Sequence, residues 1–175
     1  MIQTKNLQLF PYERVHVEAL LRDRRELAAL LNVAVPDSWP NSPEAFTLSD
    51  DDSPYSSPEQ AKWRGYFFIH PNEKVLVGNG GFKGEPDKAG AVEIGYEIAF
   101  EYWNRGFASE AAQGLMDYAF TDYSVRAVIA YTLAHKNASN AVLQKVGMKF
   151  LTEIDDAEHG KIWCWQITRD QYRPS

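Results

Sequence analysis

Three short apolar runs in the middle of the chain are rich in aromatic or β-branched residues. They are RGYFFIH, KVLVGNGGF and AVEIGYEIAF, and the stretches PNE and GEPDKAG separate them. Short runs of such residues, bounded by Gly, Pro, Asn and Asp, are typical of β-strands. Because linkers this short cannot hold a crossover connection, we expect an antiparallel meander.

The first third of the chain has a different pattern. Residues 7–10 form a short apolar run, and apolar residues then recur at roughly helical spacing between residues 12 and 31. This spacing predicts one or two helices after a first strand. VPDSWPNSP breaks the pattern with three prolines, and SDDDSPYSSPEQ (residues 49–60) is acidic and rich in Ser and Pro. We interpret this second stretch as a solvated loop.

Helical periodicity returns between residues 107 and 120. The apolar positions that share one helical face are Ala108, Ala111, Ala112, Leu115, Met116 and Ala119. RAVIAYTL then has the pattern of a strand, and NASNAVLQKVG that of a helix with an Asn cap and a terminal Gly. MKFLTEI and KIWCWQI predict a final hairpin across DDAEHG. The predicted order is therefore helices, three antiparallel strands, helix, strand, helix and two strands.

Composition restricts the class of protein. The chain has 175 residues, of which 45% are hydrophobic and 24% charged, as expected for one soluble domain. Because no apolar run reaches the length of a membrane helix and the start does not resemble a secretory signal, we expect a cytoplasmic protein without a membrane partner. Cys164 is the only cysteine and the histidines lack ligand spacing, so we expect no disulfide and no metal site. The formal net charge of −6 argues against a nucleic-acid partner.

The two faces of the third strand differ in bulk. One face would carry Val92, Ile94, Tyr96, Ile98 and Phe100, and the other Ala91, Glu93, Gly95, Glu97 and Ala99. Small residues at alternate positions leave room for a ligand or another segment to approach the backbone. A solvent-facing side of the sheet is the simpler alternative.

The stretch YWNRGFASEAA joins this strand to the helix that follows it. The first amides of a helix have no partner inside the helix and carry a partial positive charge, so a phosphate can bind them directly. Gly106 allows this approach, Asn104 tolerates a positive φ, and Arg105 can add a charged contact. A strand-to-helix turn without a ligand has the same pattern.

Two motifs resemble those of a known family. YEIAFEYWNRGFASEAA resembles the acyl-CoA-binding segment of the GNAT N-acyltransferase superfamily. NASNAVLQKVGM resembles the second signature of the branch that contains the ribosomal-protein N-terminal acetyltransferases. The resemblance covers residues 64–168 and departs from the usual motifs at Glu101, Asn104 and Lys136.

The resemblance implies an α/β fold of GNAT type in one domain over residues 1–175. Its mixed, mostly antiparallel sheet would have six to seven strands flanked by about four helices, and two parallel strands would splay apart at the acyl-CoA cleft. Residues 1–60 would supply N-terminal helices and acceptor-side loops, and residues 64–168 the coenzyme-binding core. The residues expected to contact acetyl-CoA are Ile98, Asn104, Arg105, Gly106, Phe107, Ala108, Ser109 and Asn137.

The expected reaction moves an acetyl group from acetyl-CoA to a primary amine. Glu93 is our candidate base, acting through water, with Glu97 as the alternative. Ser139 could donate to the departing thiolate, or it could cap its helix. An α-amine of pKa about 8 is roughly one-tenth neutral at pH 7, whereas a lysine is neutral in fewer than about one in a thousand molecules, so a site without a strong base favours an α-amine.

The preferred acceptor is therefore a protein N-terminus. The alternatives are a small-molecule amine, such as an antibiotic, a polyamine or an amino-acid analogue, or a silent acyl-CoA-binding sensor. We expect a monomer or a homodimer.

Overall fold

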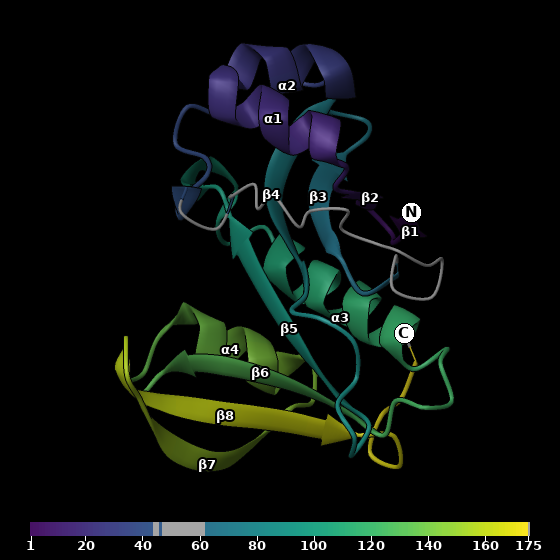
Figure 1. Cartoon of the computed structure of the whole chain (residues 1–175), viewed down its shortest axis with the longest axis vertical. Helices are drawn as coiled ribbons and strands as arrows, with labels where there is room; N and C mark the ends of the chain where they lie inside the picture. Colours follow the sequence, from purple (N-terminus) through teal and green to yellow (C-terminus); the bar gives the residue numbers. More distant parts are fainter. Residues whose placement is uncertain (44–45, 47–61, 175) are drawn as a thin grey trace.

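The computed structural model describes residues 1–43, Phe46 and residues 62–174 (Figure 1). Within them lies one mixed sheet with the strand order β1-β2-β3-β4-β5-β6-β8-β7. Its strands are β1 (Ile2–Gln3), β2 (Gln8–Pro11), β3 (Gly65–His70), β4 (Val75–Phe82), β5 (Ala91–Ile98), β6 (Ala127–Leu133), β7 (Lys149–Asp156) and β8 (Gly160–Thr168). The α-helices of these ranges are α1 (Arg14–Arg22), α2 (Arg24–Leu31), α3 (Phe107–Ala119) and α4 (Ala138–Lys145). A short 3₁₀-helix, η3 (Phe100–Tyr102), precedes α3.

The strand and helix order predicted from the sequence is confirmed. The predicted meander is β3, β4 and β5, and the predicted terminal hairpin is β7 and β8. The sheet has eight strands rather than six or seven. One of them, β1, is only two residues long and is defined by its pairing with β2, which a periodicity argument cannot detect. The loop expected at residues 49–60 lies outside the described residues.

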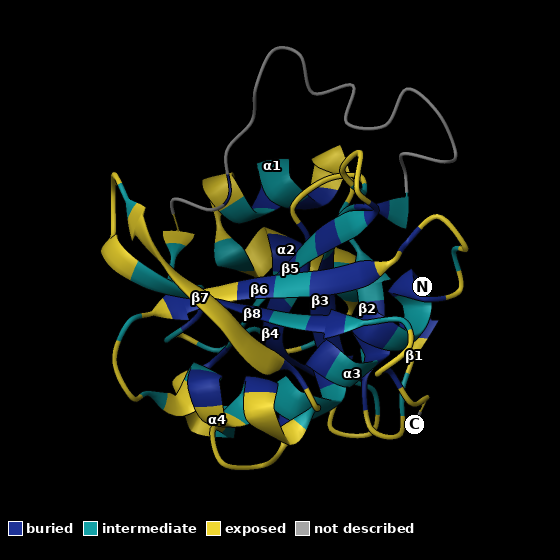
Figure 2. Ribbon diagram, turned by 90° about the horizontal axis from the view of Figure 1, so that it is seen from below, coloured by how far each residue is buried: buried dark blue, intermediate teal, exposed yellow. Residues whose placement is uncertain are grey.

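Two layers of side chains cover the sheet. α3 and α4 lie on one face, where Val92, Ile94 and Leu115 belong to the larger hydrophobic cluster. α1 and α2 contribute to a second cluster, which includes Leu27 and Phe67, beside β3 and β4 (Figure 1). Figure 2 shows the consequence for the strands: much of β6 is buried, whereas β7, at the edge, is almost entirely exposed.

The predicted apolar face of β5 is confirmed along the strand, but the prediction for Phe100 is wrong. Val92, Ile94 and Ile98 are buried against α3. The strand ends at Ile98, and the Ala99 amide makes the last bond to β4, to the carbonyl of Val77. The chain then turns into η3, so the alternation stops and Phe100 is 55% exposed.

The strands β5 and β6 form the single parallel pair of the sheet, and they stay together only briefly. Their register covers Ala91–Glu93 of β5 against Ala127–Ile129 of β6. Beyond this point β5 pairs only with β4, and β6 only with β8. The expected splay of the two parallel strands is therefore confirmed, and it opens the sheet beside the second half of β5.

Candidate functional site

A cavity of about 740 Å³ lies beside the second half of β5, between the N-terminus of α3 and one face of α4. It is lined by Asn41, Tyr96, Glu97, Ile98, Tyr102, Trp103, Asn104, Arg105, Gly106, Phe107, Ala108, Ser109, Ala138, Ser139, Ala141, Val142 and Lys145. Its volume lies in the range of small-molecule sites. A second cavity of about 580 Å³, around Asp87 and Tyr123 at the other end of β5, contains none of the residues singled out in the sequence.

The start of α3 leaves its first amides open to this cavity. Gly106, at φ 85°, precedes the helix, and its carbonyl accepts the first helical bond from the Glu110 amide at 3.0 Å. The amides of the three residues Phe107–Ser109 come before that bond and therefore have no acceptor within the helix. Asn104 has a φ of 61°, as expected, and a Cβ placed on Gly106 would meet no atom within 4 Å. The turn thus presents bare backbone to the cavity.

Arg105 lines the cavity but already has a partner. Its guanidinium forms an ion pair with Glu73 and lies over the Phe107 ring, 4.9 Å from the ring centre. The hydrogen bond from Arg105 holds the pKa of Glu73 below its usual range. Both side chains are 41% exposed, so water screens the pair and an anionic ligand can compete for the arginine.

The carbonyl of Ile98 points towards the opening between β5 and β6. The amide of Ala99 bonds to Val77 of β4, and the carbonyl of Glu93 accepts from the amide of Lys83, directly after β4. By alternation, the polar backbone groups of Ile98 therefore point the other way. This carbonyl accepts hydrogen bonds from Trp103 Nε1 at 2.7 Å and from Asn41 Nδ2 at 3.0 Å. A ligand amide that bonds to Ile98 must therefore share or replace these donors.

One face of α4 forms the opposite wall. Ala138, Ala141, Val142 and Lys145 line the cavity at intervals of three and four residues, together with Ser139. Asn137 has a different position: it is the N-cap of α4, and its side-chain oxygen accepts from the Asn140 amide at 3.0 Å.

The structure therefore brings most of the sequence-predicted residues into one cavity. These are Ile98, Asn104, Arg105, Gly106, Phe107, Ala108, Ser109 and Ser139. Glu93 and Asn137 are not in its lining. Sequence reasoning missed Asn41, Tyr96, Trp103 and Lys145. The helical spacing on α4 could have found Lys145, and the apolar face of β5 could have found Tyr96, but nothing in the sequence singles out Asn41.

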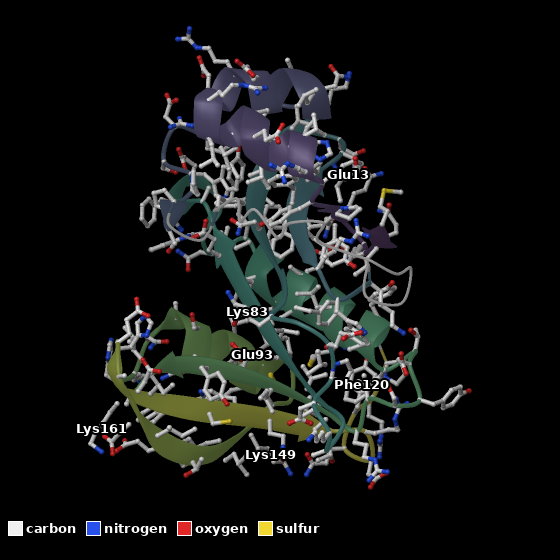
Figure 3. The ribbon with its side chains drawn as sticks, in the orientation of Figure 1. Glu13, Lys83, Glu93, Phe120, Lys149 and Lys161 are labelled. Atoms are coloured by element: carbon white, nitrogen blue, oxygen red, sulfur yellow. The ribbon has the colours of Figure 1, made fainter. Side chains whose placement is uncertain are left out.

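Glu93 lies on the other face of β5, where the parallel pair ends. It is half-buried, and burial raises the pKa of its carboxyl, although the nearby Lys83 ammonium acts in the opposite direction. Tyr131 and Cys164, from β6 and β8, interact electrostatically with the same carboxyl. Figure 3 shows Lys83 and Glu93 near one another where β5 and β6 separate. A ligand group between β5 and β6 could thus have the cavity on one side of β5 and, on the other side, the Glu93 carboxyl, whose pKa is raised.

Residues 1–43, Phe46 and residues 62–174 lack two further kinds of feature. No cluster of three or more His, Cys, Asp or Glu side chains able to hold a metal ion occurs there. No helix in this part of the chain has both the length and the apolar character needed to cross a membrane.

Comparison with known proteins identifies this architecture. The family model of the acetyltransferase (GNAT) domain matches residues 7–149. YjdG, an N-acetyltransferase of Bacillus subtilis, is 25% identical over 171 residues, which cover 94% of this chain and 97% of YjdG. The matched segments span between 34% and 97% of the length of the curated relatives compared, and less than two thirds of most of them.

Solved structures share the fold at low identity. The ribosomal L7/L12 alpha-N-protein acetyltransferase RimL, in complex with coenzyme A, has a TM-score of 0.69 at 18% identity, with 96% of this chain and 97% of that chain covered. A chimera of the spermidine N-acetyltransferase SpeG from Vibrio cholerae and hSSAT has a TM-score of 0.67 at 14% identity, with 96% and 98% covered. Because the two act on different acceptors, these similarities show the fold but do not determine an acceptor.

Proposed function

Because the chain belongs to the GNAT acetyltransferase family, we propose that it transfers an acetyl group from acetyl-CoA to the α-amine of a polypeptide N-terminus. One observation carries the coenzyme part of the proposal. The unpaired amides at the start of α3 face a cavity that is also lined by the end of β5, beyond the point where β5 and β6 stop pairing.

In this proposal the diphosphate of the coenzyme binds the loop that precedes α3 and the first turn of that helix. The amides of the segment 106–109 supply hydrogen bonds and the positive end of the helix dipole, and Arg105 adds a charge once it leaves Glu73. The pantetheine arm then extends along β5 past Ile98, which exchanges its bond to Asn41 or Trp103 for one to a pantetheine amide. The thioester reaches the gap between the strands.

The acetyl transfer needs two proton movements. The neutral amine attacks the thioester carbonyl carbon, the C–S bond breaks, and the acetyl group remains on nitrogen. The proton lost by the amine passes through water to Glu93, whose raised pKa suits a base that works near neutral pH. Ser139, on the cavity side, donates a hydrogen bond to the departing thiolate, which is then protonated from solvent.

The charges beside the proposed base favour a singly charged acceptor. Lys83 faces Glu93, and its ammonium would repel a polycation such as spermidine as that amine approached the carboxyl. An α-amine also loses its proton more easily than an alkyl amine, by about two pKa units. A peptide N-terminus therefore fits better than the second candidate, a polyamine or other small amine. The third candidate, a silent acyl-CoA sensor, differs from both because it would bind acetyl-CoA without turnover.

An acceptor panel tests the proposal. Purified protein and acetyl-CoA are incubated with peptides of varied first residue, with the same peptides blocked by N-acetylation, and with spermidine and amino sugars, and released CoA is measured. We expect release with free peptides and none with blocked ones. A preference for spermidine would replace the peptide acceptor by a small amine. Coenzyme binding without release for any amine would favour the sensor.

A further inference from the structure

The strands β6, β8 and β7 cover α4 with one face and turn the other face outwards. On the α4 side, Val128 and Trp165 belong to the same hydrophobic cluster as Leu143 of the helix, and Figure 2 shows α4 on that side of the strands. Side chains alternate along a strand, so the neighbours of Val128 and Trp165 point away from α4. Among these neighbours, Tyr131 and Leu133 are large, apolar and exposed to water.

Three aliphatic side chains form a row across this outward face. Leu133 of β6 stands opposite Ile162 of β8, and Ile162 stands opposite Ile154 of β7. Leu133 is 45% and Ile154 38% exposed, and Ile162 between them is partly exposed. Neighbouring strands lie about 4.8 Å apart, so this aliphatic row is a continuous apolar surface about 10 Å wide. Adjoining exposed apolar groups, unlike scattered ones, are typical of a binding surface.

The aliphatic row lies on the same face of the sheet as Glu93. Glu93 stands opposite Ile129 in the parallel pair, and Ile129, Tyr131 and Leu133 alternate with buried residues along β6. The row is two residues beyond Tyr131 and four beyond Ile129, or about 7 and 13 Å along the strand. Over this length β5 and β6 no longer pair. One surface therefore runs from the opening, where Figure 3 shows Glu93, to the aliphatic row without crossing the sheet.

We propose that the aliphatic row binds an apolar side chain near the N-terminus of the acceptor polypeptide. This inference rests on the proposed function, because it assumes that an α-amine meets the thioester in the opening between β5 and β6. The coenzyme occupies the α4 side of the sheet, so the amine approaches from the outward face, where Glu93 lies. An extended peptide advances about 3.3–3.6 Å per residue, so a distance of about 7–13 Å corresponds to two to four residues. The side chain that meets the row is therefore that of the third, fourth or fifth residue.

The chemistry of the row favours this occupant over two others. Leu133, Ile162 and Ile154 gain from contact with an apolar side chain, because both surfaces leave water. They offer no charge and no hydrogen bond to a polyamine or an amino sugar. A second copy of the chain seated on the row would cover the path by which an amine reaches the opening, so continuity with the opening favours the acceptor.

The test uses heptapeptides with Ser first and polar residues elsewhere, in which one Leu is moved through positions two to seven, and released CoA gives kcat and KM. Because 45% of Leu133 remains to be covered, Leu at one of positions three to five should raise kcat/KM by about three- to tenfold over the all-polar peptide, mainly through KM. Leu133→Ala should remove most of this advantage. Leu30→Ala, the matched control, deletes a side chain that is 50% exposed on α2 and should retain the advantage in full.

The results separate this inference from the proposed function. If no free peptide releases CoA, the proposed function fails and the inference fails with it. If peptides are acetylated at the same rate wherever Leu stands, or best with Leu outside positions three to five, only the role of the row is overturned. An equal loss for Leu and all-polar peptides in Leu133→Ala would also overturn it. Sedimentation covers the remaining occupant: a wild-type dimer that Leu133→Ala converts to a monomer would assign the row to a second copy instead.

Discussion

Replacing Gly106 by alanine should have two effects of different origin. The residue has a φ of 85°, a conformation that costs a residue with a Cβ about 1–2 kcal/mol. The new methyl group meets no atom within 4 Å, so packing adds nothing to this cost. Alanine also restricts the unfolded chain, which returns about 0.4–1 kcal/mol. The net loss of at most about 1.6 kcal/mol should lower the melting temperature by no more than about 6 °C in a chain of this length.

The second effect concerns the coenzyme. A methyl group at Gly106 stands where the diphosphate must approach the backbone, and losing one hydrogen bond to a charged group costs about 1.5–3 kcal/mol, or about 10- to 150-fold in the dissociation constant of CoA. Gly160 supplies the control, because it has a φ of 71°, equally open space around a Cβ, and a position at the start of β8, directly after the β7–β8 turn. Gly160→Ala should lower the stability by a similar amount, and its affinity for CoA, measured by calorimetry, should equal that of the wild type. Equal affinity losses in both variants, or none in Gly106→Ala, would refute the placement of the diphosphate.

Other side chains give further tests. Burial raises the pKa of Glu93, so the folded state holds its proton to higher pH and stability falls as pH rises from about 4.3 through the folded pKa. Glu93→Gln should therefore have the melting temperature of the wild type below about pH 4 and a higher one at pH 7. The same variant should show a flatter rise of kcat/KM with pH. A difference in melting temperature that stays constant at all pH values would contradict this. Glu73→Gln should tighten CoA binding in calorimetry, because it frees Arg105 and removes a negative charge; weaker binding would show that the ion pair preorganises the site. Trp39→Phe should cost about 1–3 kcal/mol in urea unfolding, because Trp39 Nε1 donates to the buried Asn79 Oδ1 at 2.6 Å; an unchanged midpoint would argue against that bond.

Local signals in the sequence were enough for the start of α3. A helical period predicts residues 107–120, and the helix spans Phe107–Ala119. Asn104 and Gly106 have the positive φ values that their residue types favour in a turn. These features depend on neighbours within a few residues, so the sequence carries them directly.

Two residues assigned to the coenzyme already have partners within the protein. Asn137 caps α4, as the sequence predicts, because its side chain reaches the amide three residues ahead, and its contact with the coenzyme stays a prediction. Arg105, which is predicted to add a charged contact to a phosphate, pairs with Glu73 from the turn between β3 and β4. That pair joins residues 32 positions apart, and no pattern along the chain records such a distance.

By itself, then, the sequence determined the order of the elements, the apolar face of β5 and the turn that exposes the amides of α3, since each follows from spacing and from the conformational preferences of single residues. Only the tertiary structure decided that β5 and β6 separate after Glu93 and that Tyr96 and Asn41 reach one cavity. The physical reason is that strand divergence and side-chain convergence depend on how helices and sheet pack across the whole chain. That packing free energy is shared among many distant residues.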